Sequence, residues 1–116
     1  MVIYSNFPIP KGFAGITLGP FIFIRPNYKA DKGLLEHEKV HVRQFWQMFP
    51  FFHWFYLFDK VARLNLELEA YREQLKWCEN KEASADHFAE RIANGYRLNV
   101  DRAKVKAALC ATMGLS

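Results

Sequence analysis

Residues 37–41 read His-Glu-Lys-Val-His, an HExxH pattern, within a segment whose apolar side chains recur at helical spacing. On an α-helix, positions i and i+4 lie about 40° apart around the axis, so His37 and His41 project from one face. Two imidazoles placed in this way can bind one Zn²⁺ ion at about 2.1 Å. Glu38 lies about 100° round the helix from His37, where its carboxylate can reach a metal-bound water. The stretch therefore predicts a zinc site with a general base beside it.

The segment around this motif, residues 31–49, is predicted to be helical from its N-cap Asp31 to about Gln47. Pro50 ends or kinks this helix. The apolar positions that define the helical period are Leu34, Leu35, Val40, Val42, Phe45 and Trp46.

A second helix is predicted over residues 59–80, with Asp59 as its N-cap and its end near Asn80. It returns after a short connection and can pack beside the motif helix. The helix offers two carboxylates, Glu67 and Glu69, and either could complete a His₂Glu ligand set. They point about 160° apart, so they should not both face the metal. The alternative is that both are ordinary acids on a solvated helix face.

HExxH followed by a glutamate on a later helix resembles the gluzincins, zinc metallopeptidases that include thermolysin. Residues 67–71, Glu-Leu-Glu-Ala-Tyr, are similar to the Glu-x-x-Ala-Asp version of several compact members. This match implies that Glu67, three residues before Ala70, is the third zinc ligand. Tyr71 stands where those members carry an Asp or Asn that orients a zinc-bound histidine, and its hydroxyl could serve as the hydrogen-bond partner. Residues 35–44 are also similar to small zincin-like proteins of bacteriophages and bacteria, and the resemblance covers roughly residues 13–75.

The resemblance implies a zinc-dependent peptidase acting on a peptide or protein substrate. Zn²⁺ would polarise the scissile carbonyl and activate water, and Glu38 would carry the proton to the leaving amine. A tetrahedral oxyanion then needs a hydrogen-bond donor. The candidate donors are Tyr71, Arg72, Tyr96 and His53. The alternative is a non-catalytic protein that keeps the metal for stability or docks through an aromatic surface.

The N-terminal region, residues 1–30, is predicted to contain a β-hairpin. Its strands are Phe13 to Leu18 and Phe21 to Arg25, joined by a turn at Gly19-Pro20. Because prolines flank these strands, the hairpin is expected at a sheet edge. The resemblance implies that Phe21 to Arg25 is an edge strand to which an extended peptide adds. The alternative is that the hairpin only covers the helices.

Two further helices are predicted over residues 84–113. Ser84 is the expected N-cap of the first, Gly95 ends it, and Asn99 starts the second. The chain of 116 residues is therefore predicted to be a single α+β domain. Its layout is an N-terminal β-hairpin followed by about four α-helices, and the resemblance implies a minimal zincin-like (gluzincin) architecture.

Residues 45–58 hold nine aromatic side chains. The alternatives are core packing between two helices, a docking surface for a protein partner, and an interfacial membrane contact. The aromatic residues are Phe45, Trp46, Phe49, Phe51, Phe52, Trp54, Phe55, Tyr56 and Phe58.

Charge and composition limit the other functional classes. The formal net charge is +4, but the basic residues are dispersed among acids, so no nucleic-acid partner is expected. No apolar run reaches the roughly 20 residues of a membrane-spanning helix, and no signal-peptide pattern is present. Cys78 and Cys110 form no CxxC pair, which favours a reducing compartment. The resemblance alone implies a cytoplasmic protein of a phage or a bacterium.

Overall fold

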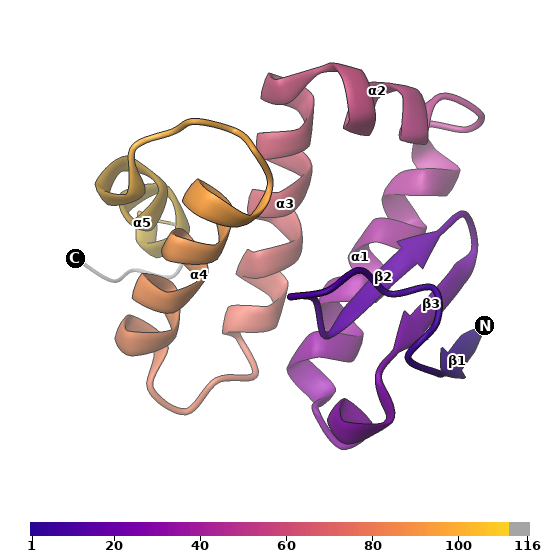
Figure 1. Cartoon of the computed structure of the whole chain (residues 1–116). Coiled ribbons are helices and arrows are strands. Elements are labelled where there is room, and N and C mark those ends of the chain that lie inside the picture. The colour runs from indigo at the N-terminus through magenta and orange to yellow at the C-terminus, as the bar shows by residue number, and fades with distance from the viewer. Residues whose placement is uncertain (112–116) are drawn as a thin grey trace.

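The structure is a computed structural model of the chain, and it describes residues 1–111. The described residues form a three-stranded sheet followed by five α-helices, which confirms the predicted α+β class (Figure 1). The strands are β1 (Val2–Tyr4), β2 (Gly15–Leu18) and β3 (Phe21–Ile24), followed by a 3₁₀ turn (Pro26–Tyr28). The helices are α1 (Lys32–Gln47), α2 (Phe52–Phe58), α3 (Lys60–Leu75), α4 (Lys81–Gly95) and α5 (Arg102–Ala111).

The predicted hairpin is present, but its second strand, β3, lies in the centre of the sheet. Strands β2 and β3 pair antiparallel around a turn in which Gly19 has a φ of +60°, a value that suits glycine. Strand β1 pairs with the other side of β3 in parallel, so the strand order is β1-β3-β2. The prediction that Phe21 to Arg25 forms an edge strand is therefore wrong. Among the described residues, β2 is the strand of the hairpin whose outer side has no partner strand.

The two central helices begin where the sequence predicts. The Asp31 carboxylate accepts a hydrogen bond from the Leu34 amide at 3.0 Å, and Asp59 accepts one from the Ala62 amide at 3.1 Å. Helix α3 ends at Leu75, however, five residues before the predicted end near Asn80.

The C-terminal helices begin at other residues than predicted. Asn80 caps α4 by accepting from the Ala83 amide at 3.0 Å, so the prediction of Ser84 as the N-cap is wrong. Helix α4 does end at Gly95. Asn99 does not start α5, because it has a φ of +54° and the helix begins at Arg102. The last part of the predicted range, residues 112–113, lies outside the described residues.

Helix α2 was not predicted, and it carries much of the aromatic stretch of residues 45–58. It bridges the ends of α1 and α3 at the top of Figure 1. Phe52 is buried, but most large side chains of this stretch are exposed, so core packing does not explain them. We call these side chains the aromatic face. Its members are Trp46, Phe49, Phe51, Trp54, Phe55, Leu57 and Phe58.

Two hydrophobic clusters lie on either side of the α1–α3 pair. The sheet core joins the β-sheet to α1 through Ile22, Ile24 and Leu34. The helical core joins α3 to α4 and α5 through residues such as Leu75, Ile92 and Leu109. Helices α1 and α3 lie between these two clusters. They contribute five buried polar or charged side chains. No helix of residues 1–111 is both long and apolar enough to span a membrane.

Candidate metal centre

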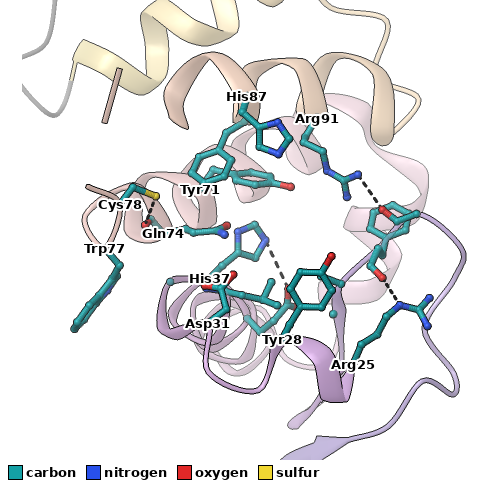
Figure 2. Close-up of a pocket in the computed structure, with 18 of the residues that line it drawn as sticks. Arg25, Tyr28, Asp31, His37, Tyr71, Gln74, Trp77, Cys78, His87 and Arg91 are labelled. Atoms are coloured by element: carbon teal, nitrogen blue, oxygen red, sulfur yellow. Dashed lines mark hydrogen bonds and ion pairs between the residues drawn. The ribbon is translucent and has the colours of Figure 1, made fainter. Parts of the chain in front are cut away.

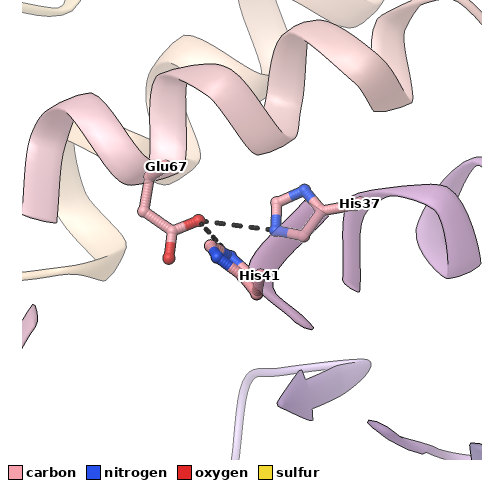
Figure 3. A group of neighbouring side chains, drawn as sticks. All are labelled: His37, His41 and Glu67. Atoms are coloured by element: carbon pink, nitrogen blue, oxygen red, sulfur yellow. Dashed lines mark hydrogen bonds and ion pairs between the residues drawn. The ribbon is translucent and has the colours of Figure 1, made fainter. Parts of the chain in front are cut away.

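The buried polar cluster is formed by His37 and His41 of α1 and Glu67 of α3 (Figure 3). The two histidines lie one turn apart on the face of α1 that packs against α3, as the HExxH spacing predicts. The exposed fraction is 3% for His37, 5% for His41 and 1% for Glu67. Burying such groups is costly unless each finds a partner, so the cluster needs a compensating interaction.

The distances from Glu67 to the two histidines are compatible with a shared metal ion. Glu67 Oε1 lies 3.4 Å from His37 Nε2 and 3.3 Å from His41 Nε2. These separations are long for charge-assisted hydrogen bonds, which are typically about 2.8 Å. Ligand atoms around a tetrahedral Zn²⁺ with bonds of about 2.1 Å stand about 3.4 Å apart. The oxygen therefore lies from each nitrogen at the spacing of two zinc ligands, and all three ligand atoms lie within 4.8 Å of one another.

The electrostatics of the cluster also suit a cation. Burial alone would raise the pKa of Glu67, but His41 and His37 outweigh it and hold this pKa far below its usual range. Burial alone would lower the pKa of His41, but the charge and hydrogen bond of Glu67, aided by Glu38 and Gln44, raise it to about 9. The carboxylate thus remains ionised and favours positive charge beside it. A divalent cation would supply that charge.

Gln44 fixes the orientation of His41. Its amide nitrogen donates to the Leu66 carbonyl at 3.1 Å and to Glu69 Oε1 at 2.6 Å. Both of these partners are acceptors, so the amide oxygen must be the atom that lies 2.8 Å from His41 Nδ1. The Nδ1 atom therefore carries a proton, so whenever His41 is neutral its Nε2 lone pair faces the cluster.

The structure separates the two candidate glutamates. Glu67 points into the cluster, whereas Glu69 is exposed and pairs with Arg43 at 2.9 Å as well as with Gln44. Glu69 therefore supports the amide that orients His41, and Glu67 is the carboxylate that can bind the metal.

Tyr56 of α2 holds the other oxygen of Glu67. Its hydroxyl donates to Glu67 Oε2 at 2.5 Å. Burial and the negative charge of Glu67 raise the pKa of Tyr56, so the hydroxyl keeps its proton. This bond leaves Oε1 as the oxygen that faces the two imidazoles.

Glu38 lies between the cluster and strand β2. Its Oε2 atom is 3.8 Å from His37 Nε2, and its Oε1 accepts a hydrogen bond from the Thr17 hydroxyl at 2.8 Å. Thr17 thus fixes one carboxylate oxygen and leaves the other near the cluster.

The predicted oxyanion donors lie in different places. The Tyr71 hydroxyl pairs with that of Tyr96 at 2.8 Å, and the Tyr71 ring packs edge-on against His37 with centroids 4.3 Å apart. Tyr71 therefore contacts the histidine through its ring. His53 accepts from the Gly19 amide at 3.0 Å. Arg72 points away from the cluster and donates to the Ala108 carbonyl of α5 at 3.2 Å.

Two cavities meet at the cluster. The β2 cavity, of about 550 Å³, runs along β2 and is lined by apolar groups such as Leu18, Phe52 and Leu57. The α4 cavity, of about 620 Å³, lies between α1, α3 and α4 (Figure 2). The residues that line both are Phe13, Gly15, His37, Glu38 and Tyr96. The candidate ligand and base are thus accessible from two sides.

Sequence reasoning assigned no role to Gln44, Tyr56 or Thr17. Gln44 carries a local signal, because a polar residue three positions after His41 lies on the same buried helix face. Tyr56 and Thr17 carry none, because each reaches the site from another element.

Comparisons of the chain with models of known protein families, with curated proteins and with solved structures find no match. The interpretation of the site therefore depends on its own geometry and chemistry.

Proposed function

We propose that this chain is a small zincin-like metallopeptidase of the gluzincin type that hydrolyses peptide bonds. The observation that carries the proposal is the buried His37–His41–Glu67 cluster, whose ligand atoms lie within 4.8 Å of one another, with Glu38 beside it. Two nitrogens and one carboxylate oxygen form the ligand set of several catalytic zinc sites, which keep a fourth position open. Helix α1 carries the motif and α3 returns the third ligand, as in the family that the sequence resembles.

In this proposal Glu38 is the general base. A bound Zn²⁺ supplies Lewis acidity, which polarises the scissile carbonyl and lowers the pKa of water towards about 7. The free Oε2 of Glu38 takes the proton from the attacking water and delivers it to the leaving amine. Thr17 holds Oε1 at 2.8 Å and thereby keeps Oε2 directed at the cluster. The oxyanion donor is the hydroxyl pair of Tyr71 and Tyr96, of which Tyr96 lines both cavities.

Strand β2 is the strand that binds the substrate in this proposal. The Arg25 amide donates to the Ala14 carbonyl, so alternation along the antiparallel ladder turns the backbone groups of Gly15 and Thr17 away from β3. Both residues line the β2 cavity beside Glu38. An extended peptide can pair with this edge and place its carbonyl near the cluster.

Peptide cleavage by the zinc-loaded protein tests the proposal. We expect the wild type to cleave members of a mixed peptide library, detected by mass spectrometry. Glu38→Gln should still bind zinc but lose at least about 100-fold in rate, because the amide cannot accept the proton. Equal cleavage by zinc-loaded wild type and Glu38→Gln would remove Glu38 from this role.

A second candidate function is favoured by the exposure of the aromatic face. Trp54 is 64% exposed and Phe58 71%, an unusual degree for neighbouring large aromatic residues. In this alternative the metal stabilises a non-catalytic protein that docks a protein partner through the aromatic face. Zinc binding by both the wild type and Glu38→Gln, with no cleavage by either, would favour it.

A further inference from the structure

His37, the first histidine of the cluster, has no hydrogen-bond partner for its Nδ1 atom among the described residues. We infer that Gln74 of α3 is the positioning residue for His37, and that its amide carbonyl accepts a hydrogen bond from Nδ1–H when Nε2 binds a metal. This inference rests on the proposed metal centre and concerns how its first imidazole is held.

Two unpaired polar atoms point to this pairing. His37 Nδ1 and Gln74 Oε1 are both buried and have no hydrogen-bond partner among the described residues. Such atoms are rare in folded proteins. A neutral imidazole that binds a metal through Nε2 carries its proton on Nδ1 and needs an acceptor there. The Gln74 carbonyl is an acceptor without a donor, so the two atoms are complementary.

The local packing brings the two side chains together. Both residues line the α4 cavity, and Figure 2 shows the Gln74 side chain reaching from α3 towards the His37 ring. Gly33 lies one turn before His37 on the same face of α1. A Cβ atom at Gly33 would lie only 3.3 Å from Gln74 Cγ and 3.4 Å from the backbone carbonyl oxygen of Gln74. The glycine therefore allows the stem of Gln74 to lie directly against α1, next to His37.

The residue expected to orient this histidine is already engaged. Tyr71 occupies the position of the orienting acid in the resembled family, but its hydroxyl is paired with Tyr96. Gln74 is one turn further along α3 and is not engaged in this way. The arrangement matches the other histidine, where an amide oxygen of Gln44 lies 2.8 Å from His41 Nδ1. Each imidazole is thus held by a glutamine.

The test measures zinc affinity by competition with a chromogenic chelator. Gln74→Met keeps the length of the side chain but removes the acceptor, and should weaken zinc binding about 10- to 100-fold. Gln74→Glu keeps an acceptor and should bind zinc about as tightly as the wild type. Gln47→Met, on the exposed last turn of α1, is the matched control and should have no effect. Circular dichroism confirms that each variant is folded.

A spectroscopic readout separates positioning from packing. In ¹H–¹⁵N spectra of the zinc-loaded protein, the His37 Nδ1–H signal should be protected from exchange in the wild type and Gln74→Glu, and lost in Gln74→Met. Gly33→Ala, which displaces the Gln74 stem without touching its amide, should also weaken zinc binding. It should have no further effect in the Gln74→Met background.

The outcomes distinguish the inference from the proposed function. A wild type that binds no zinc would overturn both. Zinc binding by Gln74→Met with wild-type affinity and an unchanged Nδ1–H signal would overturn the role of Gln74 alone. A loss in Gln74→Met that Gln74→Glu does not restore would show a packing effect and would also overturn it.

Discussion

At the scale of the residue, α-helical rotation explains why one of two neighbouring acids enters the cluster. Glu67 and Glu69 point about 160° apart on α3, so only one can point into the cluster. The sequence leaves both open from its spacing alone, and only the resemblance favours Glu67. Packing of α3 on α1 then buries Glu67 to 1% exposure and leaves Glu69 against Arg43. The two histidines are predictable as candidate ligands because they share a short local pattern.

The supports of the ligands could not be predicted in the same way. Tyr56 reaches Glu67 from α2, and Thr17 reaches Glu38 from β2, across loops whose path no local pattern specifies. Gln74 lies seven positions after Glu67, and its relation to His37 depends on how closely α3 approaches Gly33. Tertiary contacts of this kind become visible only when the elements are packed.

Tyr56→Phe tests the support of the third ligand. Without the hydroxyl, Glu67 Oε2 loses its 2.5 Å hydrogen bond and the carboxylate can rotate. We expect zinc affinity to fall about 10-fold, because partners of metal ligands typically contribute that much. Isothermal titration of the metal-free protein with zinc measures the change. Tyr4→Phe, on an exposed strand residue, is the control, and equal affinities for all three proteins would contradict the role of Tyr56.

At the scale of the element, the starts of the two central helices could be predicted from local capping residues, whereas the order of the strands could not. Asp31 and Asp59 cap their helices through side-chain bonds to amides three residues ahead, a signal wholly contained in the sequence. Asn80 and Ser84 are both good N-cap residues four positions apart, and the sequence alone favoured the wrong one. The central position of β3 depends on β1, a strand of three residues that is too short to show an alternating pattern.

Helix α2 was missed because its sequence has no polar face. Its seven residues, Phe52–Phe58, contain no charged side chain, and its N-cap makes no side-chain bond. The apolar residues therefore show no 3.6-residue period. The helix is anchored by Phe52, which packs near His41 and Phe45, while Trp54, Phe55 and Phe58 remain exposed.

Two substitutions in α2 distinguish the buried aromatic residue that anchors the helix from an exposed one. Phe52→Ala should lower the free energy of unfolding by about 3 kcal/mol, because it opens a cavity next to the cluster. Phe55→Ala, at a residue that is 41% exposed, should cost less than about 1 kcal/mol. Urea unfolding of both variants measures the difference. A loss as large for Phe55→Ala as for Phe52→Ala would show that the aromatic face is part of the core.

At the scale of the whole molecule, the cluster lies between two separate hydrophobic cores. Helix α1 carries the sheet core, and α3 carries the helical core with α4 and α5 (Figure 1). The α1–α3 interface buries His37, Glu38, His41, Gln44 and Glu67. An interface of this composition is costly without a ligand that compensates its charges. A metal ion bound by both helices would stabilise this contact and join the two halves of the fold.

The metal content of the purified protein tests the central claim most directly. Elemental analysis should find about one zinc ion per chain in the wild type, and close to none in Glu67→Ala. Glu73→Ala, which removes a glutamate of the same helix that pairs with Lys76, should keep the zinc of the wild type. A wild type that holds no zinc even after zinc is added would contradict the account. So would Glu67→Ala with an undiminished zinc content.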